Sequence, residues 1–105
     1  MAFAENLRSL PPIAAIEKLD LIGADGKLVA SIENKPGQAG SLAVYHHLAS
    51  KYGAINALAA KDGLALYAEH REDAEQHPGK HPNIDRLFKV IAENLALSTL
   101  IHPRK

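Results

Sequence analysis

The chain of 105 residues contains no cysteine and no tryptophan, and only 5% of its residues are aromatic. The lack of cysteine excludes disulfides, thiolate nucleophiles and thiolate metal ligands, and it is compatible with a reducing compartment. The shortage of aromatic residues argues against an aromatic-rich β-sandwich and favours helices with small apolar side chains. We therefore expect a cytoplasmic protein with a modest core of leucine, isoleucine and alanine.

The chain also lacks an excess of charge, with 12 basic and 12 acidic residues. A protein that neutralises nucleic-acid phosphates needs a positive face, so nucleic acid is not an expected partner. No stretch approaches the roughly 20 apolar residues that span a bilayer, so we expect no membrane association. The first eight residues include Glu5 and do not resemble a secretory signal. The length predicts a single domain over residues 1–105.

Two short alternating segments predict a β-hairpin near the N-terminus. Residues 16–22 and 27–33 flank Asp25-Gly26, a dipeptide that readily adopts the positive φ of a tight turn. Before them, residues 2–10 predict a short helical turn. It should end at residue 10, because the two prolines that follow disfavour helix. This hairpin is the clearest strand prediction in the chain.

Two later segments predict amphipathic helices. Residues 41–52 place their apolar side chains on one side, with Ser41 as the expected N-cap and Gly53 as the C-terminal stop. Residues 83–96 repeat apolar positions at helical spacing, with Asn83 as the expected N-cap. The end of this segment, from about residue 96 to 101, either continues the helix or forms a short strand.

The segment within residues 56–77 is ambiguous. Its alanine, leucine and glutamate content favours a helix over 64–77. A hairpin between 55–60 and 64–70 is the alternative, because Asp62-Gly63 could form its turn. We expect an α+β fold in which the N-terminal β-hairpin packs against about three helices. The alternative is a ferredoxin-like βαββαβ sheet.

Three segments carry a resemblance that covers the chain as a whole. They are residues 34–37 (Asn-Lys-Pro-Gly), 67–70 (Tyr-Ala-Glu-His) and 81–88 (His-Pro-Asn-Ile-Asp-Arg-Leu-Phe). Through them the chain resembles a small bacterial family classed only as a domain of unknown function. This resemblance implies no activity and no ligand.

A second resemblance concerns residues 30–37, the helix that follows and residues 53–56. This arrangement is similar to the opening of ACT domains, ferredoxin-like regulatory modules that bind amino acids beside a Pro-Gly turn. Over about residues 28–102 it implies an amino-acid ligand and a four-stranded sheet. The chain departs from that pattern, because its second and third strands would fall in the alanine-rich segment that favours helix.

The loop before the first long helix is a candidate site for a small-molecule ligand. Its candidate residues are Asn34, Lys35, Pro36, Gly37, Gly40 and Ser41. A helix N-terminus attracts anions, so a small anion or carboxylate fits this position. The loop matches neither the P-loop nor the dinucleotide-binding glycine pattern. A plain strand-to-helix connection is the alternative interpretation.

The polar stretch 69–86 contains a candidate site for a divalent metal cofactor. Its four candidate ligands are His70, Asp73, His77 and His81. If 64–77 is helical, the first three point to one side, because steps of three and seven residues return to one face. Imidazole and carboxylate groups bind zinc and similar ions. A metal-binding protein or metal-dependent enzyme is thus one alternative function. A solvated helix face that carries histidines is the other interpretation.

The same stretch also predicts a polar joint between two helices. In this interpretation Asn83 caps a helix, Asp85 meets its positive end, and Arg86 pairs with Glu69 or a neighbouring acid. No serine lies in a strained glycine elbow. We therefore expect a small binding or interaction module of unknown ligand, not an enzyme.

The sequence is also compatible with a homodimer. Its core is small, and its near-zero net charge does not oppose association. Tyr45, Tyr52 and Tyr67 combine an apolar ring with a polar tip, which suits half-buried surfaces. We expect them on or near an interface.

Overall fold

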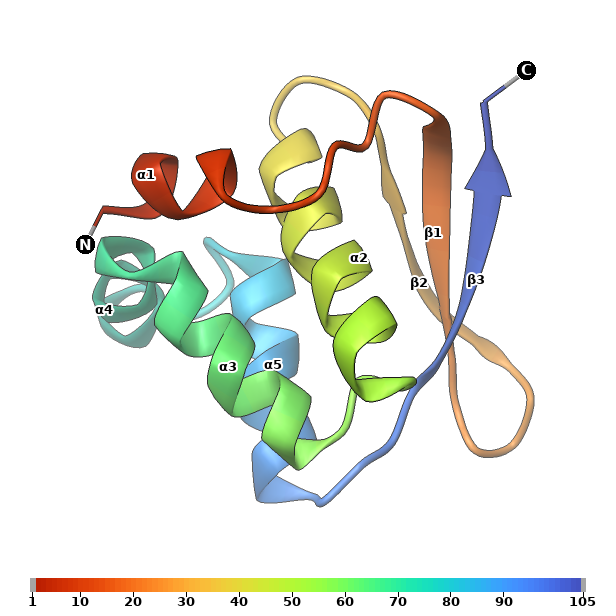
Figure 1. Ribbon diagram of the computed structural model, residues 1–105. Coiled ribbons are helices and arrows are strands. Elements are labelled where there is room, and N and C mark those ends of the chain that lie inside the picture. Colours follow the sequence, from red (N-terminus) through yellow and green to blue (C-terminus); the bar gives the residue numbers. More distant parts are fainter. Residues whose placement is uncertain (1, 105) are drawn as a thin grey trace.

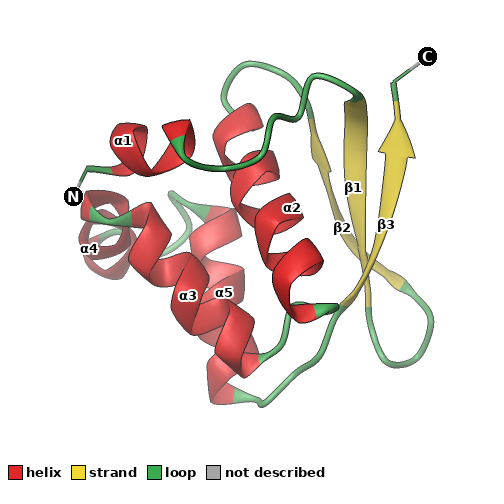
Figure 2. Ribbon diagram, in the orientation of Figure 1, coloured by secondary structure: helices red, strands yellow, loops and turns green. Residues whose placement is uncertain are grey.

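The computed structural model describes residues 2–104, which form five helices and three strands. In chain order these are α1 (Phe3–Arg8), β1 (Ile16–Ile22), β2 (Leu28–Glu33), α2 (Ala39–Tyr52), α3 (Ala57–Tyr67), α4 (Glu69–Gln76), α5 (Pro82–Ala92) and β3 (Ser98–Pro103). Figure 2 shows the helices gathered on one side of the sheet. The fold is α+β with an N-terminal β-hairpin, as predicted.

The three strands form an antiparallel sheet in the order β2-β1-β3. Leu19 in the central strand lies opposite Ile32 of β2 and Ile101 of β3. Successive side chains of a strand point to opposite faces, so Asp20 lies on the outer face. There it accepts hydrogen bonds from Ser31 and His102. Residues 98–103 pair with β1 as strand β3. The alternative left open for residues 96–101 is thus resolved in favour of a strand.

The helices form two layers against the inner face of the sheet. Helix α2 lies next to the strands, and α3 and α5 pack on its other side (Figure 1). Leu42 and Leu48 of α2 are fully buried between these layers. Helix α1 lies near α3 and α4, at the end of the molecule where the chain starts. The core consists mainly of leucine, isoleucine and alanine side chains, as the composition indicates, with valine and tyrosine among them.

The predicted helix over 64–77 is wrong in one respect, because the helix is interrupted at Ala68. This residue has φ 52° and ψ −118°, outside helical values, and it separates α3 from α4. The alternative hairpin is also wrong, because both parts of the segment are helical. Asn56 begins α3 by accepting the N–H of Ala59. With helices at these positions, the ferredoxin-like alternative is wrong as well, and the amino-acid regulatory function loses its structural basis.

Ala68 offers a first test of this break. A positive φ costs an L-residue about 1–2 kcal/mol, whereas glycine adopts it freely. We expect Ala68→Gly to raise the free energy of unfolding by about 1 kcal/mol, after the entropy of the more flexible unfolded chain is subtracted. In Ala65→Gly, within regular α3, the same change should cost about 1 kcal/mol. Urea unfolding measures both variants, and equal losses would contradict the strained geometry.

Both expected N-caps are wrong, although the helices are present. Helix α2 begins two residues early, at Ala39, so Ser41 lies inside its first turn. Helix α5 begins at Pro82, because proline suits the first helical position, and His81 takes the N-cap position. Gly53 ends α2 in a left-handed conformation, as predicted.

Two tyrosines lie in the core, contrary to their predicted place at an interface. Tyr45 is fully buried and Tyr67 is 3% exposed. Tyr52 is half-buried, and its hydroxyl donates to Asp62. The homodimer stays a prediction that sedimentation can test. None of the helices within residues 2–104 has the length and apolar character needed to cross a membrane.

Candidate functional site

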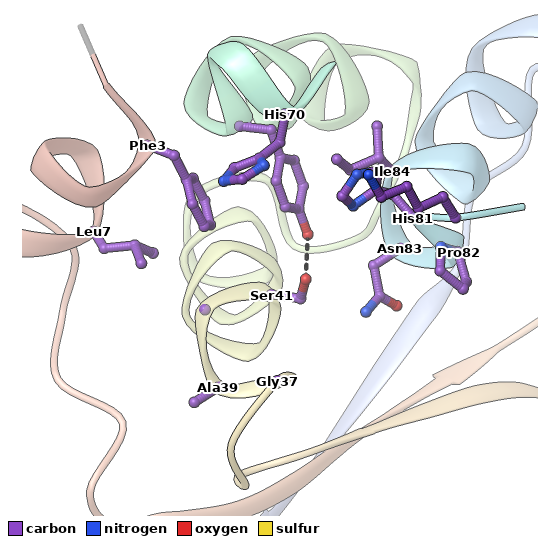
Figure 3. A pocket seen from close by; sticks show the side chains of 13 residues that line it. Phe3, Leu7, Gly37, Ala39, Ser41, His70, His81, Pro82, Asn83 and Ile84 are labelled. Atoms are coloured by element: carbon purple, nitrogen blue, oxygen red, sulfur yellow. Dashed lines mark hydrogen bonds between the residues drawn. The ribbon is translucent and has the colours of Figure 1, made fainter. Parts of the chain in front are cut away.

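A pocket of about 460 Å³ lies where α1, the first turns of α2 and α5, and the α3–α4 junction meet (Figure 3). It is lined by Gly37, Gly40 and Ser41 from the predicted ligand loop. It is also lined by His70 and His81 from the predicted metal set. Two segments that the sequence treats as separate candidates therefore border one pocket.

Helix α1 forms one wall through Phe3 and Leu7. Three contacts hold this helix in place. Asn6 is buried and donates its amide to the backbone oxygen of Leu66 at 2.9 Å. The N–H of Phe3 donates to Glu69 Oε1 at 2.8 Å, and the Phe3 ring stacks on Tyr67 with centroids 5.2 Å apart. The wall thus depends on contacts with residues 60 or more positions away.

The base of the pocket is a hydrogen bond between two helices. The Tyr67 hydroxyl donates to Ser41 Oγ at 2.7 Å, the bond that Figure 3 marks with a dashed line. Burial raises the pKa of Tyr67, so the phenol keeps its proton. A side chain at Gly40 would place Cβ 3.3 Å from the Phe3 ring. The absence of that side chain leaves room between α1 and α2.

The opposite side is formed by the start of α5, where Asn83 is held in one orientation. Arg86 donates Nη1 to Asn83 Oδ1 at 2.7 Å, so the amide nitrogen lies on the side facing Ser41 (Figure 3). The Tyr45 hydroxyl donates to the Asn83 backbone oxygen at 2.5 Å and accepts from Arg86 at 3.3 Å. Burial raises the pKa of Tyr45 to about 12. Arg86 therefore donates hydrogen bonds to Asn83 and Tyr45, and does not pair with Glu69 or a neighbouring acid as predicted.

Asp73 organises the charged groups beside the pocket. Its carboxylate lies 2.5 Å from His81 Nε2, 3.0 Å from Lys80 Nζ and 3.2 Å from His77 Nδ1. The hydrogen bonds from His81 and Lys80 lower the pKa of Asp73 to about 2. An ionised carboxylate only accepts hydrogen bonds, so His81 carries a proton on Nε2 in either charge state. Its other ring nitrogen remains for a further partner.

The three histidines of the predicted metal set have different neighbours in the structure. His70 packs edge-on against Phe3, with ring centroids 5.0 Å apart, and lies 5.7 Å from His81. Across residues 2–104, no three side chains of the His, Cys, Asp or Glu types are grouped so as to hold a metal ion. The metal site stays a prediction. Elemental analysis of protein purified without a histidine tag, beside a His70→Ala His77→Ala double variant, tests it.

Several predicted site residues have structural roles outside the pocket. Asn34 donates its amide to the backbone oxygens of Ile13 and Ile16, which ties the loop to the start of β1. Lys35 pairs with Glu33 at 2.9 Å on the exposed surface. Pro36 is exposed, and Asp85 accepts the N–H of Gly79 at 2.9 Å. His77 is likewise exposed beside Asp73.

The sequence interpretation missed the residues that give the pocket its apolar and cationic character. These are Phe3, Leu7, Tyr67, Lys80 and Ile84. Phe3 and Leu7 lie four residues apart, which is the spacing of one helix face. That spacing is a signal by which the sequence could have indicated a packed face, though not its partner. Lys80 stands between two candidate histidines and could have been included on that ground.

The sheet, its helical cover and this pocket define a small α+β protein with a ligand-sized pocket. The chain belongs to the family described as "Uncharacterized protein conserved in bacteria (DUF2322)", whose model matches residues 3–101. This match confirms the predicted resemblance to a small bacterial family. Comparison with curated proteins and with solved structures found no match.

The lowered pKa of Asp73 predicts a specific dependence of stability on pH. A carboxylate whose pKa is lower in the folded protein than in the unfolded chain stabilises the fold at pH values above the unfolded pKa. This stabilisation is lost as the pH falls through the folded pKa. The contribution of Asp73 should therefore disappear between the ordinary value of 3.8 and about 2. We expect the urea midpoint of the wild type to fall more over this range than that of Asp73→Asn. Parallel curves for the two proteins would contradict the pairing.

Proposed function

We propose that the protein is a small cytoplasmic binding module, without catalytic activity, whose pocket takes a small organic molecule. The observation that carries this proposal is the convergence of the 37–41 turn and the 70–83 segment on one pocket. Its volume of about 460 Å³ lies within the range typical of small-molecule sites. Apolar side chains with a few oriented polar groups are also typical of such sites.

The hydrogen bonds at the pocket support binding over catalysis. A nucleophilic serine needs an adjacent base that takes its proton. Ser41 instead accepts a hydrogen bond from Tyr67, whose raised pKa keeps it protonated. The carboxylate of Asp73 is already paired with His81 and Lys80. These groups orient one another, and none is arranged to activate a hydroxyl.

A thermal-shift screen of small organic fragments tests this proposal. A ligand at ten times its Kd adds about 1.4 kcal/mol, which corresponds to a rise in Tm of about 6 °C for a domain of this size. We expect hits with the wild type that are lost in Gly40→Ile, because the new side chain meets Phe3 and Leu7 within the pocket.

Ser50→Ile is the matched control, since it places the same side chain on the exposed far end of α2. This variant should keep the hits. A screen in which no fragment separates the wild type from Gly40→Ile would overturn the proposed function.

A further inference from the structure

Asn83 and Ser41 each offer the pocket a hydrogen-bond donor. Arg86 occupies Asn83 Oδ1, so the Asn83 amide offers its NH₂ group to the pocket. Ser41 Oγ accepts a hydrogen bond from the Tyr67 hydroxyl, which leaves the serine hydroxyl hydrogen to donate. A carboxylate accepts hydrogen bonds and donates none. The donor pattern thus suits a carboxylate better than an amine or an alcohol.

The charges around this end of the pocket favour the same ligand group. Lys80 and His81 line the pocket and share a single carboxylate, Asp73. Glu69, the next acid towards α1, is engaged by the backbone N–H of Phe3. Lys80 is more than half exposed, so its flexible side chain can turn from Asp73 towards a bound anion.

The other end of the pocket is aromatic. Phe3 lies against both Tyr67 and His70, at centroid distances of 5.2 and 5.0 Å, and His70 continues this surface to His81. In Figure 3, Phe3 stands on the side opposite Asn83. Aromatic rings gain affinity from offset or edge-to-face contacts with one another. The pocket therefore has a ring-binding end and a donor end.

We propose that the ligand is an aromatic carboxylate, with its ring against Phe3 and His70 and its carboxylate on Asn83, Ser41 and Lys80. This inference rests on the proposed function and names the chemical class of the molecule bound. It depends on two separate features of the pocket: the hydrogen bond that Asn83 Oδ1 accepts from Arg86, and the adjoining rings of Phe3, Tyr67 and His70.

Four matched probes test the inference by calorimetry or ligand-detected NMR. They are 2-naphthoate, 2-naphthamide, 2-naphthylmethylamine and decahydro-2-naphthoate. We expect 2-naphthoate to bind at least about tenfold more tightly than each of the other three, because only it offers both an ionised acceptor and a flat ring. Equal affinity for the amide or amine would overturn the carboxylate, and equal affinity for the saturated acid would overturn the ring.

Asn83→Asp is the decisive variant. It replaces the donor with a charged acceptor of the same shape and keeps an oxygen for Arg86. The 2-naphthoate preference should disappear in this variant, while His77→Gln, beside Asp73 but outside the lining, should retain it. An unchanged preference in Asn83→Asp would overturn the inference. If the fragment screen gives other hits but 2-naphthoate does not bind, the inference fails and the proposed function stands. If nothing binds in either experiment, both fail.

Discussion

Gly63→Val is expected to lower the free energy of unfolding by about 3 kcal/mol, a large part of the stability of a domain of this size. Gly63 is buried in α3 at the point where this helix meets α2 and α5. A Cβ there would lie 2.8 Å from Leu48 Cδ1 and 2.9 Å from Leu87 Cδ1. Both leucines are fully buried, so neither can move aside without displacing the core.

Smaller and matched changes separate this crowding from helix propensity. Gly63→Ala should cost only about 1 kcal/mol, because the strain of overpacking is partly offset by the better helix propensity of alanine. Ala65→Val, at an exposed position of the same helix, should cost about 0.5 kcal/mol. Urea unfolding gives all three values. A Gly63→Val variant as stable as Ala65→Val would contradict the close packing of the three helices.

Tyr67→Ala is expected to cost about 3–5 kcal/mol, as is typical for the loss of a buried aromatic side chain. Tyr67 is 3% exposed, stacks on Phe3 and donates to Ser41. It therefore connects α1, α2 and α3 at the base of the pocket. Removing it deletes the surface on which α1 rests and enlarges the pocket beneath Phe3.

Tyr67→Phe divides this effect into its parts. The ring and its contact with Phe3 remain, and only the hydrogen bond to Ser41 is lost, so the expected cost is about 1 kcal/mol. Thermal and urea unfolding of both variants provide the comparison. A Tyr67→Ala cost close to that of Tyr67→Phe would show that the ring adds little, and the pocket would then lack its proposed base.

The parts of the fold that follow from local sequence were predictable. The hairpin depends on alternation and on Gly26, whose φ of 82° an L-residue rarely adopts. Helix α2 has an apolar side and a glycine at its end. The break at Ala68 carries no such signal, because alanine is a strong helix former and no glycine or proline marks the position. Here tertiary packing overrides the local preference.

The pocket could not be predicted as a unit, because its parts are distant in the chain. The ligand loop and the histidine-containing stretch were each identified, but their meeting depends on how α2 packs on α3 and α5. The contribution of Phe3 depends in addition on Asn6, which fixes α1 through the backbone of Leu66. Similarly, the orientation of Asn83 depends on Arg86, for which the sequence suggested an acidic partner. Local patterns supplied candidate residues, whereas packing determined their grouping.

A titration of ¹⁵N-labelled protein with 2-naphthoate tests most directly whether the two segments form one binding site. We expect the amide signals of Gly37, Gly40 and Ser41 to shift together with those of His81 and Asn83, along a single binding curve. The amides of the turn between β1 and β2, at the end of the sheet away from α1 (Figure 1), should stay in place. Shifts confined to one of the two segments, or centred on the sheet, would contradict this expectation.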